Sequence, residues 1–245
     1  MMISSVWHEI VYQPLYNILA FLIGVLPGHS VGLAIITLTV VVRLALFPLT
    51  GKSMKAQKVM KELEPELKRI REAHKNDKQL QAKKTMELYQ EKGVTPFSGC
   101  LPLFIQIPII IGLYIVFKDL KEIDPHYLYS FIQSPGTLDM HFLIFDLAAK
   151  SVLLAGTAGF AQFIQTDLSL GRQPAQAPST EKKSFQEDLQ KSMQVQMRYV
   201  LPIMISFIAF NAAAAVALYW TTSNILSIVQ ELLIRRSMKK KKEQE

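Results

Sequence analysis

The sequence predicts an all-α polytopic membrane protein with five transmembrane helices and a charged helical hairpin on one side. Three observations support the membrane assignment. Half of the 245 residues are hydrophobic. They gather in runs of about 14 to 21 residues, close to the length that crosses a ~30 Å hydrocarbon core as a helix. The charged residues lie mainly between the runs and give a formal charge of +7, as basic loops beside a membrane would.

The motif content argues against an enzyme. The only cysteine is Cys100, so the sequence offers neither a disulfide framework nor a cysteine-based metal site. The five histidines follow no repeated spacing, and we find no nucleotide-binding loop and no nucleophile paired with a base. We therefore predict no catalytic residues, no cofactor and no metal. Residues 1–30 contain no Lys or Arg, so we also expect no signal peptide.

Residues 1–30 are predicted to form an amphipathic segment on the outer membrane surface. The apolar stretch within residues 6–26 is interrupted by Pro14 and stops at Pro27-Gly28, which leaves it short for a span. Aromatic side chains at its edge favour the membrane–water interface; they are Trp7, Tyr12 and Tyr16. A helix in the headgroup plane is favoured, and a sixth span is the open alternative.

The first span is predicted over residues 31–50, VGLAIITLTVVVRLALFPLT. Its one cation, Arg43, lies eight residues before Gly51, and therefore ~12 Å from the inner end of a straight helix. A charge at that depth costs at least ~2.5–3.5 kcal/mol, so the side chain should face protein or water. Thr39 lies one turn away on the same face. Arg43 either lines a wet cavity that receives a negative group, or snorkels to the headgroups or pairs with a buried acid.

Residues 52–93 are predicted to form a cytoplasmic helical hairpin. The segment carries 12 Lys or Arg residues. Its first helix has one apolar seam at three- and four-residue steps, made of Met60, Leu63, Leu67 and Ile70. Pro65 should kink or restart this helix. The sequence KNDK at 75–78 indicates a turn, after which residues 79–92 resume a helical composition.

The second span is predicted over residues 97–117, where Pro102 and Pro108 flank Gln106. The backbone groups that these prolines free need partners in neighbouring helices, so this span should be packed against others.

The third span is predicted over residues 142–165, with Asp146 and Lys150 as an i,i+4 pair near its outer end. The remaining segments are a cytoplasmic linker and helix over 166–197, fourth and fifth spans over 198–233 that divide at Asn211, and a disordered basic cytoplasmic tail over 234–245.

The distribution of cations predicts the orientation. With five spans, 23 of the 27 Lys and Arg residues fall on one side of the membrane, and only Lys118 and Lys121 fall on the other. The positive-inside rule then places the N-terminus outside and the C-terminus in the cytoplasm. A sixth span before residue 30 would move no cation, so this count leaves that alternative open.

Three stretches resemble the YidC insertase family of bacteria, which is related to insertases of mitochondria and chloroplasts. They are GLAIITLTVVVRLALFPLT, TPFSGCLPLFIQIPIIIGLY and LYWTTSNILSIVQ, and they follow the family's order and spacing, with the charged hairpin between the first two. The resemblance implies a five-span core whose groove opens to the cytoplasm and to lipid but is closed outside. Such proteins move short hydrophilic tails across the membrane without hydrolysing nucleotide, and release the hydrophobic segment into lipid.

The resemblance also implies site residues. The family's groove arginine falls on Arg43, and its polar groove partners fall on Gln165 and Trp220. Thr39 and Gln106 complete our candidate substrate-binding groove. The sequence departs from the family before the last span, where NAAAA at 211–215 replaces the usual Pro and Gly. The large outer domain of Gram-negative members and the lipoprotein cysteine of many Gram-positive members are also absent from this sequence.

The partners implied are nascent membrane proteins with short translocated tails, membrane lipids, the ribosome and the Sec translocon, in a bacterial cell membrane. The alternative function is a secondary transporter or an anion-binding membrane protein that uses Arg43. A transporter would predict an internal repeat, and we find none.

Overall fold

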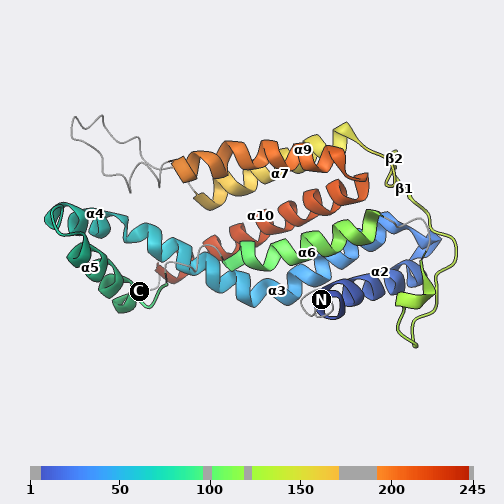
Figure 1. Ribbon diagram of the computed structural model, residues 1–245, viewed down its shortest axis with the longest axis horizontal. Coiled ribbons are helices and arrows are strands. Elements are labelled where there is room, and N and C mark those ends of the chain that lie inside the picture. The colour runs from blue at the N-terminus through green and yellow to red at the C-terminus, as the bar shows by residue number, and fades with distance from the viewer. Residues whose placement is uncertain (1–6, 96–100, 119–122, 171–191, 243–245) are drawn as a thin grey trace. The chain divides into compact units, whose positions relative to one another are not determined.

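The computed structural model describes residues 7–95, 101–118, 123–170 and 192–242. Regular structure in these residues is almost entirely helical (Figure 1). The helices are α2 (Gln13–Val25), α3 (Val31–Glu62), α4 (Glu64–Ala73), α5 (Lys78–Glu91), α6 (Leu101–Lys118), α7 (Val152–Leu170), α9 (Leu201–Asn211) and α10 (Ala214–Lys242). Helical turns are η1 (His8–Tyr12), η2 (Pro27–His29), η4 (Pro125–Tyr127) and η5 (Gln196–Val200), and two short strands are β1 (His141–Phe142) and β2 (Phe145–Asp146).

The chain divides into two units. The first contains residues 1–45 and 108–229, and the second contains residues 46–107 and 230–245. Within the described residues, Val31–Glu62 and Ser192–Asn211 are long and apolar enough to cross a membrane, and Gln106–Phe117 is a shorter apolar helix. These helices fit a helical membrane protein.

In the first unit, α2 is anchored to the segment that follows α6. Pro14 does not interrupt α2, because it lies in the first turn, where its missing N–H has no intrahelical partner to lose. Asn17 is fully buried. Its side-chain amide donates to the carbonyl oxygen of Tyr127 at 2.8 Å and accepts from the backbone N–H of Tyr129 at 2.7 Å. A buried amide with both ends paired fixes one relative position of the two segments.

The start of the third predicted span is different in the structure. The helix begins at Val152, and residues 141–146 form the antiparallel β1–β2 hairpin. The prediction of Asp146 and Lys150 as an i,i+4 helical pair is therefore wrong. The Asp146 carboxylate instead accepts from the backbone N–H of Ala148 at 2.9 Å.

Contacts of the hairpin explain this difference. Phe142 packs so closely on α3 that a Cβ at Gly32 would lie 2.3 Å from its ring. The carbonyl oxygens of Leu147 and Ala149 accept from the backbone N–H groups of Ala215 at 3.1 Å and Ala214 at 2.8 Å. These are N–H groups of the first turn of α10, which have no partner within their own helix. The segment is non-helical because it caps another helix.

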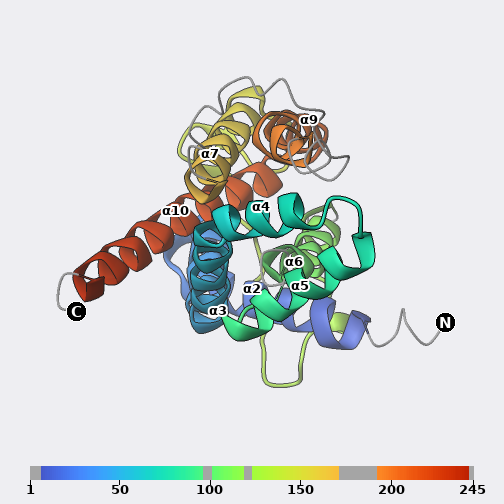
Figure 2. The ribbon, with the colours of Figure 1, turned by 90° about the vertical axis from the view of Figure 1, so that its left-hand side faces the viewer.

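Helices α7 and α9 lie side by side in the first unit (Figures 1 and 2). Their close approach is possible because Gly159 has no side chain: a Cβ there would lie 1.7 Å from Ser206 Oγ. Helix α9 ends at Asn211 and α10 begins at Ala214, which agrees with the expected turn. Of the linker and helix expected over residues 166–197, residues 171–191 lie outside the described residues, and Ser192 onward is helical.

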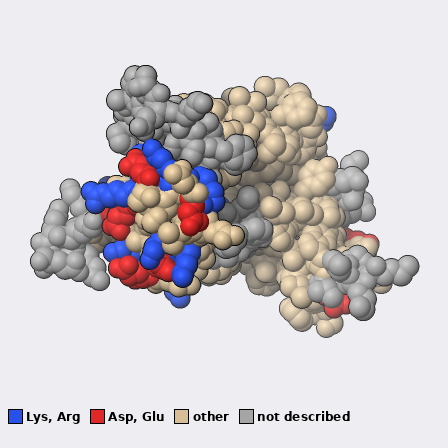
Figure 3. All heavy atoms as spheres, turned by 60° about the vertical axis from the view of Figure 1, so that its left-hand side comes forward, with Lys and Arg blue, Asp and Glu red and all other residues tan. Residues whose placement is uncertain are grey.

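In the second unit, α4 and α5 fold back on each other as a hairpin (Figure 2). Helix α3 ends at Glu62 and α4 restarts at Glu64, with Pro65 in its first turn, where proline is tolerated. Asp77 caps α5, because its carboxylate accepts from the backbone N–H of Leu80 at 2.9 Å. Lys and Arg side chains alternate with Asp and Glu over this hairpin, as Figure 3 shows.

The hairpin has a small apolar core of its own, made of Leu63, Leu67, Leu88 and Val94. We expect Leu67→Ala to destabilise the hairpin by about 2–4 kcal/mol, because it removes a buried side chain. Met86→Ala is the matched control, since Met86 lies on α5 and is 47% exposed. Limited proteolysis should cut the Leu67 variant within residues 62–92 much faster than the Met86 variant. Equal cleavage of both would contradict a packed hairpin.

The basic C-terminal segment is the other departure from prediction. Helix α10 continues to Lys242, so the expectation of a disordered tail is wrong for residues 235–242. Lys, Arg and Met are good helix formers. An i,i+4 ion pair also supports the helix here, with Arg235 Nη2 2.7 Å from Glu231 Oε1.

Candidate functional site

Arg43 lies in the apolar part of α3 and is partly buried. Thr39, one turn earlier, is 1% exposed. Its hydroxyl donates to the carbonyl oxygen of Ile35 at 2.6 Å, which is a bond within the same helix. Thr39 therefore does not need a partner from elsewhere in the protein, whereas the five donors of the Arg43 guanidinium do.

Ser223 on α10 is the partner of Arg43. The guanidinium Nε donates to Ser223 Oγ at 3.1 Å, and Nη2 donates to the same oxygen. Ser223 is 1% exposed. A hydroxyl orients the guanidinium by accepting these two bonds, but it carries no charge to neutralise it.

The positive charge of Arg43 has no anionic partner in the part of the chain that the structure describes. None of the ion pairs found there includes Arg43. The nearest acid in the sequence of α10 is Glu231, and its carboxylate binds Arg235. The interpretation of Arg43 as one half of a buried pair therefore has no support among these residues.

The next residue of α10 adds a second group with unused donors. Asn224 is 6% exposed, and its Nδ2 is buried without an acceptor among the described residues. Ser227, one turn further, donates to the carbonyl oxygen of Ser223 at 3.0 Å. Buried donors are nearly always satisfied by protein or water. Arg43 and Asn224 therefore each carry donors suited to carboxylates or peptide carbonyl groups.

Comparison with known proteins now identifies the family. A family model described as 60Kd inner membrane protein matches residues 22–242. The chain is 35% identical over 244 residues to the membrane protein insertase YidC of Oceanobacillus iheyensis, which covers 98% of this chain and 87% of that protein. It is 32% identical over 235 residues to the membrane protein insertase MisCA of Bacillus subtilis, covering 94% and 79%.

The chain belongs to the YidC family of membrane protein insertases. It is also 36% identical over 207 residues to the YidC of Francisella philomiragia, but this match covers only 32% of that longer protein.

The structure places the other candidate groove residues of this YidC-family chain in different surroundings. Trp220 lies in α10 and is 5% exposed within the apolar core of the first unit. Gln165 is partly buried in α7; it accepts from Gln162 at 3.3 Å and donates to Ser169 Oγ at 3.0 Å, so its bonds stay within its own helix. Gln106 is partly buried in α6 and belongs to the second unit.

Sequence reasoning missed Ser223 and Asn224. The signal was present, because TTSN at 221–224 places four polar residues in succession inside an apolar run. Serine and threonine in membrane helices commonly bond to their own backbone, as Thr221 does to Ala217. Only the contact with α3 distinguishes Ser223 from its neighbours.

The second unit of this YidC-family chain contains a matching polar contact. Gln230 Nε2 donates to Thr50 Oγ1 and to the carbonyl oxygen of Phe47 at 3.3 Å. Thr50 and Gln230 are 180 residues apart, as are Arg43 and Ser223. Helices α3 and α10 are thus joined at the same sequence offset in both units. Gln230 also satisfies a backbone oxygen of α3 beside Pro48, the proline inside that helix.

Proposed function

We propose that this protein is a membrane protein insertase that moves short hydrophilic tails across the bilayer through a polar groove and releases the transmembrane segment into lipid. The observation that carries the mechanism is Arg43, whose guanidinium is held by the uncharged Ser223 hydroxyl. A cation oriented in this way, without an ion-pair partner among the described residues, can attract an acidic tail. That attraction is stronger where water is limited.

The proposed groove is formed by polar groups of the spans. Arg43 and Asn224 offer donors to the client, and Thr39, Gln165 and Trp220 are the other proposed lining residues in the first unit. A client tail in such a groove keeps part of its hydration and crosses a shorter length of hydrocarbon. The client's apolar segment then leaves sideways, because lipid suits it better than the polar groups do. No step requires nucleotide.

The proposed topology has five spans, with the N-terminus outside and the C-terminus in the cytoplasm. The asymmetry of the cations supports it, since 23 lie on the side assigned to the cytoplasm. The α4–α5 hairpin and the basic end of α10 then face the cytoplasm, where nascent chains, ribosomes and the Sec translocon are the proposed partners.

Complementation tests the function directly. Expression of this chain in bacteria depleted of their own insertase should restore growth and the insertion of a single-span client with a short translocated tail. Protease protection of that tail in inverted vesicles measures insertion. Failure to restore insertion, with the protein present in the membrane at the level of the host insertase, would contradict the proposal.

The basic end of α10 is expected to strengthen ribosome binding. Residues 235–245 contain six Lys or Arg residues, which would attract ribosomal RNA through its phosphates. Deleting residues 235–245 should weaken co-sedimentation with ribosomes and flatten its dependence on salt. A variant in which the six Lys and Arg residues are changed to Gln keeps the length of the segment and removes only its positive charge. If neither change alters ribosome binding, these cations serve another purpose, such as contact with anionic lipid.

A further inference from the structure

The tip of the β1–β2 hairpin is apolar, and no other part of the described chain covers it. Leu143 and Ile144 are 83% and 84% exposed. The residues on either side, Phe142 and Phe145, are paired in the strand register and pack against the core of the first unit. The tip therefore projects from a fixed base.

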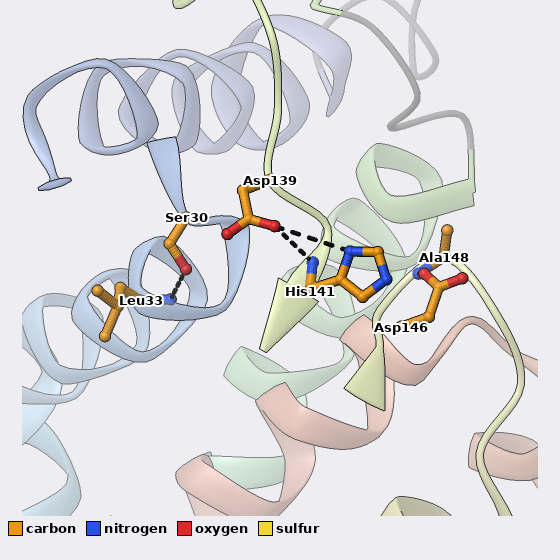
Figure 4. Close-up of polar contacts among 6 residues, drawn as sticks. All are labelled: Ser30, Leu33, Asp139, His141, Asp146 and Ala148. Carbon is orange, nitrogen blue, oxygen red and sulfur yellow. Dashed lines mark hydrogen bonds and ion pairs between the residues drawn. The ribbon is translucent and has the colours of Figure 1, made fainter. Parts of the chain in front are cut away.

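Hydrogen bonds hold that base in place (Figure 4). The Asp139 carboxylate accepts from the backbone N–H of His141 at 2.9 Å, and the backbone carbonyl of Asp139 accepts from Val31 at 3.0 Å. On the other strand, the Asp146 carboxylate accepts from the N–H of Ala148. The segment before the hairpin is thus tied to the start of α3, and a local carboxylate turn lies at each end of the hairpin.

The backbone of Leu143 is in a conformation that leucine rarely adopts. Its φ is 54°, in the left-handed region that favours glycine. Such strain persists where the surrounding structure or a function requires it. A leucine at this place gains almost nothing from packing within the described chain, which favours a contact outside it.

The position of the tip indicates what that partner is. Leu147, three residues after Ile144, bonds to the first turn of α10. At ~3.3 Å per residue, and with the hydrogen bond added, the tip lies within about 13 Å of that turn. The apolar helix α7 begins shortly after the hairpin, and its first residues, Val152 and Leu153, are 73% and 60% exposed. The tip therefore lies close to the ends of α7 and α10. The lipid headgroups surround the ends of membrane-spanning helices.

Size favours lipid over a protein partner, and one nearby cation, Lys150, can reach a lipid phosphate beside the carboxylates of Asp139 and Asp146. Lys150 is exposed and lies between the hairpin and α7, with its Nζ 6.0 Å from the centroid of the Phe210 ring. A lysine beside apolar side chains can place its ammonium at the level of lipid phosphates. A stable protein interface needs about 1,000 Å² of buried surface, far more than a tip of two residues provides.

We propose that the β1–β2 hairpin is a lipid-binding finger. Leu143 and Ile144 enter the boundary between headgroups and acyl chains, and Lys150 binds a lipid phosphate. The topology proposed above assigns the finger to the outer leaflet, but the lipid contact itself does not depend on insertase activity. The finger would then determine how deep in the bilayer the segment that caps α10 lies.

Fluorescence quenching in liposomes tests the lipid contact. The full chain with Cys100→Ser and Ile144→Cys, labelled at position 144 with an environment-sensitive dye, is reconstituted into liposomes of phosphatidylcholine and phosphatidylglycerol. The matched control carries the label at Ser134, an exposed polar position in the same segment before the hairpin. We expect lipids spin-labelled near the top of the acyl chain to quench position 144 at least about threefold more strongly than position 134.

The opposite pattern would overturn the proposal. Equal quenching of positions 144 and 134 by aqueous iodide, without quenching by spin-labelled lipid, places the tip in water. Protection of position 144 in cell membranes but not in liposomes assigns it to a protein partner instead. As a further check, Leu143→Gly suits a φ of 54° and should keep the hairpin folded. It should lower lipid quenching at position 144, and unchanged quenching would exclude Leu143 from the contact.

Discussion

Replacing Arg43 with Ala is expected to reduce insertion about tenfold for clients whose translocated tails carry several acidic residues, and to leave clients with neutral tails nearly unchanged. The reason is that Arg43 supplies a positive charge held by an uncharged hydroxyl of Ser223. Arg43→Lys should keep most of the activity, because a compact ammonium still attracts carboxylates without the guanidinium geometry. Protease protection of tails with graded acidity measures the effect.

Ser223→Ala is the matched control for this prediction. It removes the hydroxyl that orients Arg43 but keeps the charge, so we expect a loss several times smaller than for Arg43→Ala. A cysteine at position 43, in the Cys100→Ser background, should react with a water-soluble thiol reagent added from the cytoplasmic side.

The contrary outcome is also specific. If Arg43 is a structural partner in a buried pair, Arg43→Ala would leave a buried group unpaired and lower thermal stability. Insertion would then fall equally for every tail, and a cysteine at position 43 would be unreactive. This combination of results would contradict a water-accessible groove around Arg43.

Much of the helical architecture could be predicted from the sequence, because proline positions and the lengths of apolar runs determine where helices begin and end. Proline favours the first turn of a helix, where Pro65 lies, and a break beside Asn211 is expected in a run too long for one span and too short for two. Arg43 could likewise be found from its depth alone, since a charge within an apolar run is costly.

The β1–β2 hairpin could not be predicted in the same way. Phe142 to Phe145 is an apolar run that continues toward the helix beginning at Val152, and periodicity cannot distinguish a short apolar strand from a helical segment. What decides the structure is non-local: Phe142 packs on Gly32, and the following carbonyl groups cap α10. Ser223 was missed for the same reason, because its role exists only through its contact with Arg43.

Gly159→Ala is expected to destabilise the protein by about 1–3 kcal/mol, the usual cost of overpacking a close contact. The new Cβ would lie 1.7 Å from Ser206 Oγ and 3.0 Å from both Ser206 Cβ and the carbonyl oxygen of Pro202. Rotation of the serine side chain relieves only the first of these contacts. The other two involve the backbone of α9 or atoms fixed to it, so α7 and α9 must move apart.

Gly156→Ala is the matched control, because it lies on the same helix α7 and a Cβ there meets no atom within 4 Å. Alanine is favoured over glycine within a helix by about 1 kcal/mol, so this variant should be as stable as the parent or more so. Thermal unfolding in a single detergent compares the two variants. Ser206→Ala, added to Gly159→Ala, removes the oxygen at 1.7 Å and should recover part of the loss. If both glycine variants are equally stable, the close approach of α7 and α9 is not a requirement of the fold.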